Sequence, residues 1–452
     1  MSRRGDRRQA RTGRRAIAAL GVGAAAAVAG GTALRRRATA ARVALPQDPH
    51  HLGAGVGTPL ADLAALAREE GGGEPVCLVD LDALDANLDL LLAAACQQDV
   101  ALRPALKSLP SPGLAAHVLG RLPEPRGMVF HLRHVEPLVA ACPAGLDLLT
   151  GYVPTPGELA RHLQRPGPAT PHRVRIAVDT LELLDLAIEL ARESPRPGPI
   201  ELAVELDAGA GRGGFTDADE VAVVGRRLRE ARAAVRVTAV LCYDAHATLT
   251  PRTSVRRAVA ADARRRLRRL HDALRSAAGD AIDELEVNGP GSANHRQWES
   301  DDLLTEISPG SALLYARYLR AGFDDEDLSV ACLLAAPVLR RVGPLPRIPL
   351  TRQPVPGRRR EQLMLKGGGW PTAGGTQPTM VWPGGLEENE LYGGRGNNTG
   401  TIAAPPGRLR PGDVILLWPH QVGDAIEYFG AVTAVRAGEV VARWPTLPRW
   451  GA

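Results

Sequence analysis

Only two lysines, Lys107 and Lys366, stand among 53 arginines in this chain of 452 residues. Where almost every basic position uses arginine, a retained lysine is a candidate for chemistry that arginine cannot perform. Arginine stays protonated, whereas a desolvated lysine amine can lose its proton and attack a carbonyl group to form a Schiff base. Lys107 follows an apolar run, residues 100–106, that predicts a buried strand. We therefore expect a reactive amine at a strand end; the alternative is an ordinary surface lysine.

A glycine-rich turn follows another predicted strand, residues 285–287, and contains Asn288, Gly289, Gly291 and Ser292. Glycines let backbone N–H groups approach a phosphate closely, and a serine hydroxyl adds a hydrogen-bond donor. The turn therefore predicts a phosphate site, although an ordinary strand-to-helix turn would contain the same residue types.

Further polar residues follow predicted strands: Arg212 lies in a second glycine-rich turn, and Tyr243 and His246 come after the next strand. A tyrosine or histidine in such a place can stack on an aromatic ring or move a proton, so both are candidate catalytic residues. His295 and Lys366 are weaker candidates for contact with a substrate. Ordinary structural roles fit these residues too, such as a solvated arginine or a histidine bound to the backbone.

The elements that would position these residues alternate between strand and helix signals. Short apolar runs bounded by turn residues predict eight strands, and stretches with helical periodicity lie between them. The predicted strands are residues 76–79, 100–105, 128–132, 146–149, 174–178, 200–206, 235–242 and 285–287, and the helices include 84–95, 180–192, 217–233 and 254–278. This alternation predicts an α/β fold with a closed (β/α)8 barrel of the TIM type.

The character of the sequence changes near residue 328, where helical periodicity ends, glycine and proline become dense and short β-like runs follow. The predicted regions are a signal or anchor segment 1–42, a linker 43–73, a barrel 74–327 and a C-terminal all-β domain 328–452, with β runs at 414–417, 431–435 and 439–441. Residues 340–360 are basic and proline-rich and predict a long exposed loop.

The net charge of +5 is unevenly distributed, because residues 1–42 hold eleven arginines against one acidic residue and the rest of the chain is net negative. We therefore expect no nucleic-acid surface. Arginines flank the uncharged stretch 16–34, and residues 12–17 resemble a twin-arginine export signal. An export signal, a membrane anchor and a disordered basic tail all fit. The first two place the protein in the cell envelope, and otherwise it is cytoplasmic.

The five cysteines are scattered, odd in number and outside any metal-ligand spacing, so we expect no disulfide framework and expect most of them to be buried thiols.

Five segments, in this order, are similar to the motifs of one known family: residues 79–87, 103–108, 202–214, 287–292 and 306–315. Together they resemble the fold-type III pyridoxal-phosphate enzymes of the alanine racemase N-terminal-domain superfamily, and within it the D-threonine aldolase and D-serine dehydratase branch. The resemblance covers about residues 75–320 and continues more weakly to the end. One segment alone is weakly specific, whereas five in order are specific.

The resemblance implies a pyridoxal 5'-phosphate cofactor held by Lys107 as a Schiff base, with its phosphate on residues 288–292. It also implies that Arg212 lies near the cofactor, that Tyr243 approaches its ring, and that Tyr315 belongs to the cofactor site. The expected activity is that of a lyase or aldolase on a small D-amino acid, by aldol cleavage, β-elimination or deamination. Lys107 is then the base for the α-proton.

One departure from the branch concerns metal. Its members carry a His-x-Asp or His-x-Cys pair near the end of the second domain, where this chain has His420 followed by Gln421 and Val422. Valine has no ligating atom, and Asp424 lies four residues from His420. His420 and Asp424 are therefore weak metal candidates, a structured divalent-metal site is doubtful, and metal-assisted chemistry at a β-hydroxyl is in doubt.

Two other functions stay open. An amino-acid racemase needs a base on each face of the ring, for which Tyr392 and Tyr428 are available. A non-catalytic pyridoxal-phosphate-binding protein of the envelope is the third hypothesis; the extra β domain favours an enzyme. The family resemblance also implies a homodimer.

Overall fold

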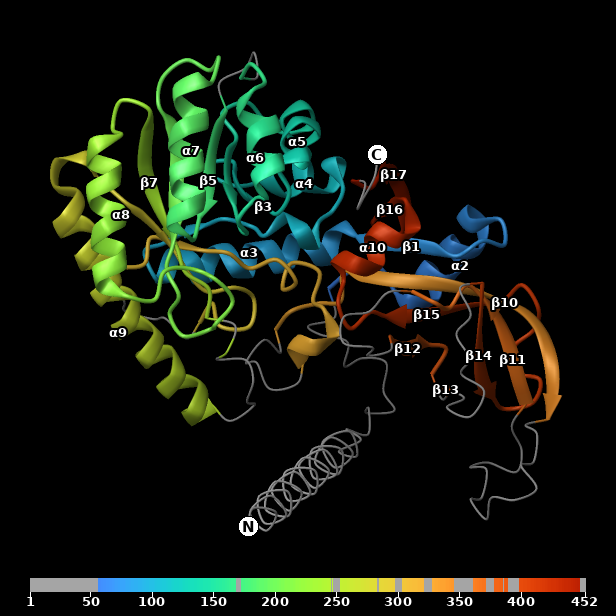
Figure 1. Cartoon of the computed structure of the whole chain (residues 1–452). Helices are drawn as coiled ribbons and strands as arrows, with labels where there is room; N and C mark the ends of the chain where they lie inside the picture. Colours follow the sequence, from blue (N-terminus) through green and yellow to red (C-terminus); the bar gives the residue numbers. More distant parts are fainter. Residues whose placement is uncertain are drawn as a thin grey trace, which may run out of the picture. The chain divides into compact units, whose positions relative to one another are not determined.

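The computed structural model describes residues 56–167, 172–244, 246, 253–282, 284–296, 303–320, 327–344, 361–370, 378–384, 386–388 and 398–447 (Figure 1). The predicted signal or anchor segment 1–42, residues 345–360 of the predicted loop, and Tyr392 lie outside these residues. Within the described part, no helix combines the length and the apolar character that crossing a membrane requires.

Eight parallel strands form a nearly closed barrel, in the order β2-β9-β8-β7-β6-β5-β4-β3. They are β2 (Ala101–Leu102), β3 (Arg126–Val129), β4 (Asp147–Thr150), β5 (Arg173–Val178), β6 (Ile200–Glu205), β7 (Val235–Leu241), β8 (Glu286–Asn288) and β9 (Glu306–Ile307). An isolated bridge between Ala105 and Met128 joins the two ends of the sheet. The predicted fold class is confirmed, and β9 supplies the closing strand.

Helices follow the strands and cover the outside of the barrel (Figure 1). They are α3 (Leu81–Gln97), α4 (Pro112–Leu119), α5 (Val135–Ala141), α6 (Pro156–Leu163), α7 (Leu181–Glu193), α8 (Ala218–Glu230) and α9 (Thr253–Ala278). Polar caps fix where several begin: the side chains of Asp80, Thr180 and Asp217 accept backbone N–H groups of the first turns. Thr155 and Glu158 form a capping box at α6.

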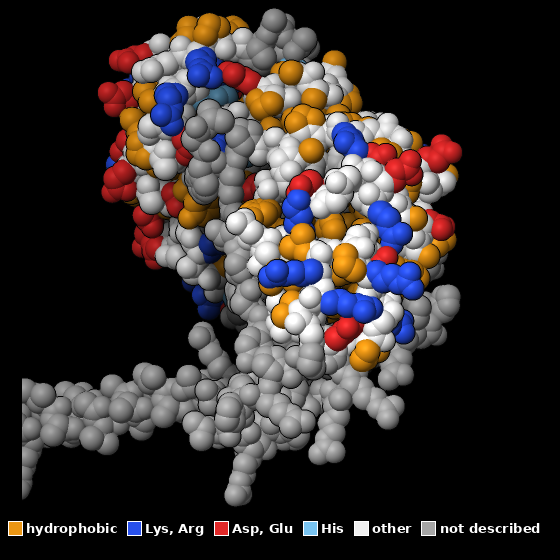
Figure 2. All heavy atoms as spheres, turned by 90° about the vertical axis from the view of Figure 1, so that its right-hand side faces the viewer, with side chains coloured by type: hydrophobic (Ala, Val, Ile, Leu, Met, Phe, Trp, Pro, Cys, Tyr) orange, Lys and Arg blue, Asp and Glu red, His pale blue; other side chains and the backbone are white. Residues whose placement is uncertain are grey.

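The second sheet has nine strands, along the path β13-β14-β11-β10-β1-β16-β17, with β15 pairing to β10 and β12. Its strands are β1 (Val76–Asp80), β10 (Cys332–Pro344), β11 (Glu361–Lys366), β12 (Thr379–Trp382), β13 (Glu387–Glu388), β14 (Thr399–Ala404), β15 (Val414–Trp418), β16 (Ala431–Arg436) and β17 (Glu439–Pro445). Figure 2 shows basic side chains dispersed over a face of this part of the molecule, as on an ordinary solvated surface.

The first predicted strand, β1, does not belong to the barrel. It pairs antiparallel with β10 and parallel with β16 in the second sheet. Four of the five residues of β1 are buried, and they would be buried in either sheet. An apolar run therefore predicts that a strand forms, but it does not predict which strands pair with it.

Two helices interrupt regions for which the sequence predicted none. The predicted linker 43–73 contains α2 (Leu60–Gly71), which buries Leu63, Ala64 and Ala67. The predicted all-β domain contains α10 (Gly423–Phe429), which buries Ala425 and Ile426. Residues 340–344, predicted as loop, continue strand β10. Both helices are short and are stabilised by packing rather than by a long periodic pattern.

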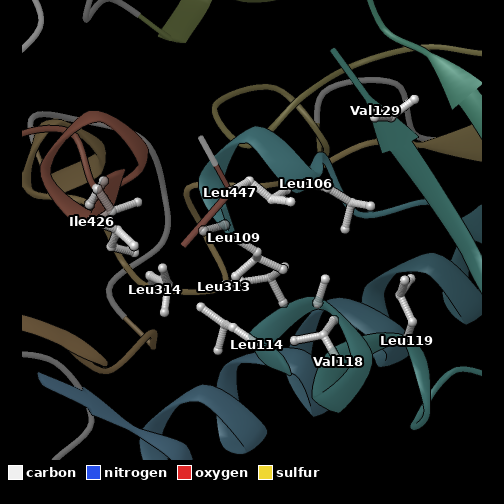
Figure 3. Packing of buried hydrophobic residues seen from close by; sticks show 14 of the residues in the cluster. Leu106, Leu109, Leu114, Val118, Leu119, Val129, Leu313, Leu314, Ile426 and Leu447 are labelled. Carbon is white, nitrogen blue, oxygen red and sulfur yellow. The ribbon is translucent and has the colours of Figure 1, made fainter. Parts of the chain in front are cut away.

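One continuous hydrophobic core joins the barrel and the second sheet. Figure 3 shows Leu447 beside Leu106 and Leu109, and Ile426 on the side of Leu314; Leu447 and Ile426 come from the C-terminal part of the chain. Cys77, Cys242 and Cys332 are buried in this core, and all five cysteines are free thiols. The two sheets therefore bury apolar surface against each other as well as within themselves.

A layer of paired charges lies where the barrel strands begin. It consists of four arginines and four carboxylates: Arg103, Arg126, Arg173, Arg175, Asp147, Glu201, Glu286 and Glu306. The side chains of Arg103 and Arg175 are fully buried in it. Equal numbers of opposite charges in contact offset the cost of removing them from water. We call these eight residues the ion-pair layer.

Candidate active site

A cavity opens at the carboxyl ends of the barrel strands, the end at which barrel enzymes place their active sites. Its open space is about 670 Å³, with the open solvent at its mouth included. The lining residues are Ala105, Lys107, Ser108, Met128, Phe130, Gly151, Arg212, Leu241, Cys242, Tyr243, Asn288, Gly289, Gly291, Ser292, Ser308, Gly310, Ser311, Tyr318 and Gln421.

Lys107 lies in a short 3-10 turn, Leu106–Ser108, which residues 103–105 connect to β2. Its side chain is exposed to solvent and lines the cavity, and nearby protein atoms partly desolvate the amine. Desolvation and then the positive charge of Arg212 lower the pKa of Lys107 to about 8, against an opposing effect of Asp424. The amine lies 4.5 Å from the centre of the Phe130 ring. Lys107 can therefore lose its proton near neutral pH, as a nucleophilic amine must.

Arg212 is held between two tyrosine rings. Its guanidinium carbon lies 5.3 Å from the ring centre of Tyr152 and 4.7 Å from that of Tyr243. It also donates a hydrogen bond to the backbone oxygen of Gly151 (2.9 Å). Stacking and hydrogen bonding together fix a planar cation at the cavity wall. Burial raises the pKa of Tyr243, so its phenol stays protonated at neutral pH.

The glycine-rich turn is locked to the segment after β9. The hydroxyl oxygen of Ser292 accepts hydrogen bonds from the backbone N–H groups of Gly310 (2.9 Å) and Ala312 (3.1 Å). Because that oxygen is already accepting, the Ser292 hydroxyl hydrogen is available to donate to an anion. A Cβ at Gly310 would lie 2.7 Å from the backbone oxygen of Ala105, so the close packing requires glycine there.

The residues present fit a phosphorylated aldehyde such as the cofactor expected from the sequence. A primary amine of lowered pKa, a stacked arginine, a glycine-rich turn and a serine hydroxyl all face one cavity. A Cβ at Gly291 would come within 3.2 Å of the Tyr243 ring, so glycine keeps that wall open. Amine and phosphate cradle are the two attachments that such a cofactor needs.

Seven predicted site residues line this cavity together: Lys107, Arg212, Tyr243, Asn288, Gly289, Gly291 and Ser292. They come from four separate stretches of the chain. Their chemical roles stay predictions.

Three other candidates do not line the cavity. The backbone of Tyr315 has a positive φ of 47°, and its carbonyl accepts a hydrogen bond from Trp418 Nε1 (2.7 Å). His246 lies against Gly209. His295 is buried, and its Nδ1 lies 2.8 Å from the backbone oxygen of Ser292. This contact indicates that His295 supports the glycine-rich turn. Burial lowers the pKa of His295 to about 4.

Lys366 lies at the end of β11 and forms an ion pair with Glu74, outside the cavity lining. Tyr428, one of the two tyrosines considered for racemisation, is 48% exposed on α10 and is also outside the lining.

The metal candidates do not form a ligand group. No cluster of three or more histidine, cysteine, aspartate or glutamate side chains suited to a metal occurs in the part of the chain that the structure describes. His420 instead lies 5.9 Å, ring to ring, from Tyr318, and burial followed by the charge of Arg317 lowers its pKa to about 4. Val422 is buried at the start of α10. These side chains do not fit a His-x-Asp or His-x-Cys pair.

Sequence reasoning missed Phe130, Tyr318 and Gln421, which also line the cavity. Gln421 comes from the C-terminal part of the chain. Backbone hydrogen bonds from Arg317 to Pro419 (3.1 Å) and from Tyr318 to His420 (3.4 Å) bring it to the cavity. No motif marks these residues. Phe130 directly follows β3 and Tyr318 follows β9, whereas Gln421 reaches the site through the packing of the second sheet on the barrel.

A buried carboxyl group, Glu205, was missed as well. It is 3% exposed at the end of β6. Burial raises its pKa to about 7, with the charge of Arg212 acting in the opposite direction. A strand-end glutamate after an apolar run was the available signal.

The comparisons with known proteins agree with this geometry. Residues 79–317 match the family model "Alanine racemase, N-terminal domain". A D-threonine aldolase from Filomicrobium marinum is similar in structure, with 21% identity and a TM-score of 0.64 over 83% of this chain and 97% of that one. D-threo-3-hydroxyaspartate dehydratase from Delftia sp. HT23 has 20% identity and a TM-score of 0.64 over 83% and 98%.

An alanine racemase of Clostridium difficile 630 is similar at 15% identity, with a TM-score of 0.59 over 82% of this chain and 97% of that one. At these identities the likeness to solved structures shows the fold. No curated protein sequence matches the chain.

Proposed function

Because this chain belongs to the alanine racemase N-terminal-domain family, we propose that it is a pyridoxal-phosphate enzyme that acts on a small D-amino acid, with Lys107 as its cofactor lysine. The observation that carries the proposal is the cavity, where Lys107 meets Arg212 and the glycine-rich turn. Its structural neighbours include a D-threonine aldolase and a D-threo-3-hydroxyaspartate dehydratase. We therefore place aldol cleavage and β-elimination first, with deamination as the outcome of elimination.

Lys107 and Arg212 divide the work at the reacting end of the cavity. When bound, pyridoxal phosphate supplies an electron sink for charge that develops at the substrate α-carbon. Lys107 attaches the cofactor through Nζ and afterwards holds or moves the α-proton at that same atom. A pKa of about 8 keeps a useful fraction of this amine neutral at mildly alkaline pH. Arg212, fixed by Tyr152 and Tyr243, would help to orient the bound cofactor, and its charge disfavours the protonated form of Lys107.

The glycine-rich turn would bind the phosphate. Ser292 can donate its hydroxyl hydrogen to it, and the absence of a Cβ at Gly291 keeps the turn clear of the Tyr243 ring. Phe130 covers the Lys107 amine and limits its hydration. A cofactor held at its phosphate in this way would keep its reactive carbonyl close to Lys107 before a substrate arrives.

Racemisation is the second candidate, and one observation supports it: Tyr318 lines the cavity together with Lys107. A phenol there can serve as the second acid or base that racemisation needs. A racemase returns the enantiomer of its substrate, whereas a lyase releases an aldehyde, a keto acid or ammonia. Chiral chromatography of the products from D-serine, D-threonine and D-alanine distinguishes the two.

The decisive experiment tests the attachment at Lys107. We expect the purified full chain to show the visible absorbance of bound pyridoxal phosphate, and borohydride reduction followed by peptide mass mapping to find the label on Lys107. Lys107→Ala should lose the band and the label. The control is Lys366→Arg, which alters the only other lysine and should keep both.

A chain that binds no added pyridoxal phosphate would refute the enzyme proposal. Cofactor bound without turnover of any D- or L-amino acid would instead favour the non-catalytic binding protein.

We further propose that residues 1–42 export the protein or anchor it in the cell envelope and that the enzyme is a homodimer. The arginine-flanked apolar stretch supports the first proposal. Cell fractionation of the full chain and of a chain that begins at residue 43 tests the location, and sedimentation of the latter tests the dimer.

A further inference from the structure

A path of buried polar side chains connects the ion-pair layer with the floor of the cavity. Its members are Arg103, Glu306, Asn288 and Ser308, and the first three have no solvent exposure. Asn288 and Ser308 also line the cavity, whereas Arg103 and Glu306 do not. Buried polar groups are costly unless they are hydrogen-bonded, so each contact along this path constrains the next.

The path begins with a two-pronged ion pair. Arg103 donates from Nε and Nη2 to the two carboxylate oxygens of Glu306, both at 2.7 Å. Arg103 lies on the segment that leads into Lys107, and its backbone N–H donates to Ile307 (2.9 Å). A planar guanidinium bound in this way fixes both position and direction. The Lys107-bearing segment is therefore tied to β9 by side chain and backbone together.

Glu306 also holds the glycine-rich turn. Asn288 Nδ2 donates to Glu306 Oε2 (3.1 Å) and to Ser308 Oγ (2.8 Å). The backbone oxygen of Glu306 accepts from the N–H of Gly289 (3.1 Å). Glu306 thus binds the first two residues of the glycine-rich turn directly. Through Arg103 it also binds the segment that carries Lys107.

The ionised state of Glu306 decides which way the Asn288 amide points. Burial alone would raise the pKa of Glu306, but the charge and hydrogen bonds of Arg103 lower it well below its ordinary value. A carboxylate only accepts hydrogen bonds, so Asn288 must present its NH2 group to it. A neutral amide at position 306 could accept or donate, and would let the Asn288 side chain turn over.

We propose that Glu306 is a positioning residue for the active site. Through Arg103 it holds the segment of Lys107, through Asn288 it holds the glycine-rich turn, and it thereby fixes the distance between the two. The inference rests on the proposed function, because it concerns how the pyridoxal-phosphate cavity is held. Glu306 touches neither cofactor nor substrate and acts through the residues that do.

Glu286 provides a matched control. It belongs to the same ion-pair layer and contacts Arg103 Nη2 at 3.3 Å and Arg126 at 3.4 Å. Glu286→Gln therefore alters a second carboxyl group of the same layer and leaves the hydrogen bond between Asn288 and Glu306 in place.

The experiment measures the dissociation constant of pyridoxal phosphate for the full-length wild-type chain, Glu306→Gln and Glu286→Gln. Spectrophotometric titration is done well below the melting temperature of each, and thermal unfolding is recorded in parallel. We expect both variants to have lower melting temperatures than the wild type. The dissociation constant should rise on the order of tenfold for Glu306→Gln, the loss of affinity typical of a removed supporting hydrogen bond. Glu286→Gln should bind the cofactor like the wild type.

Equal cofactor affinity in both variants, or an equal loss in both, would overturn the positioning role and leave Glu306 a stabilising ion only. A wild-type chain that takes up no cofactor would overturn the proposed function and this inference with it. Should Glu306→Gln fail to fold, Arg103→Lys keeps the positive charge beside Glu306 and removes the paired hydrogen bonds at a residue outside the cavity lining. The positioning role then requires weaker cofactor binding by Arg103→Lys, and wild-type affinity would refute it.

Discussion

At the scale of single residues, the protonation of Lys107 depends on its surroundings, first on desolvation and then on Arg212. Replacing Arg212 by glutamine removes the nearby positive charge, so we predict that the pKa of Lys107 rises above about 8. Reductive methylation with 13C-formaldehyde and NMR titration measure this in the cofactor-free Lys366→Arg background, where one lysine remains.

Arg229→Gln is the control, because Arg229 is exposed on α8. It should leave the Lys107 titration unchanged. A Lys107 pKa that does not move with Arg212→Gln would show that desolvation alone accounts for the shift.

Glu205 gives a prediction for stability against pH. Its pKa in the fold is raised to about 7, above its value near 4.3 in an unfolded chain. The folded state therefore binds more protons between these values, and stability from this group is lost as pH rises through that window. We predict that the free energy of unfolding of the wild type falls by on the order of 2 kcal/mol between pH 5 and 8 because of this group. Glu205→Gln should not show this fall.

Urea unfolding of the cofactor-free chain at several pH values checks this prediction. Parallel pH profiles for the wild type and Glu205→Gln would contradict it.

Residue chemistry made Lys107 and the glycine-rich turn predictable. Lysine is rare in this chain, so the type of Lys107 alone carries information, whereas the glycine-rich turn was informative only together with the other motifs in order. Phe130, Tyr318 and Gln421 are common in every structural role, and their function at the cavity depends on neighbours far away in sequence. His246 and His295 show the reverse: their types suggested chemistry, and the fold places them outside the lining.

At the scale of elements, α10 packs its first residue against the turn that carries Lys107. A Cβ at Gly423 would collide with the backbone oxygen of Lys107. We predict that Gly423→Ala displaces α10 and costs about 1–3 kcal/mol of stability, as overpacking typically does. Chemical denaturation measures the loss, and weaker cofactor binding should accompany it because Gln421 lies next to the helix.

Gly157 offers the matched control, because it also stands at the start of a helix, α6, and a Cβ there would meet nothing within 4 Å. Gly157→Ala should be neutral or stabilising by less than about 1 kcal/mol. Equal effects of the two substitutions would argue against the close contact at Gly423.

Strand prediction succeeded where apolar runs are bounded by turn residues. Strands β2 to β8 overlap seven predicted runs, and the family motif at residues 306–315 contains β9. The error at β1 concerned pairing, because backbone pairing depends on partners that a local pattern does not contain. Helices α2 and α10 are short, and their stability comes from contacts with the rest of the fold.

At the scale of the whole molecule, the uneven charge leads to a prediction about location. Residues 1–42 hold eleven arginines, and the remainder is net negative. We predict that the full chain is recovered with the cell envelope and that a chain starting at residue 43 stays in the cytoplasmic fraction. Immunoblots of the fractions check this, and recovery of both chains from the cytoplasm would contradict it.

The pairing of β1 has a consequence for how the polypeptide is made. Leu78 and Val79 leave the ribosome early, yet their partners Cys332, Thr433 and Ala434 are synthesised only after the entire barrel. An apolar strand with free edges must therefore wait, exposed or shielded by a chaperone, while more than 250 residues are added. A gene truncated after the barrel would yield a protein whose first strand stays an open edge, prone to pair with other chains.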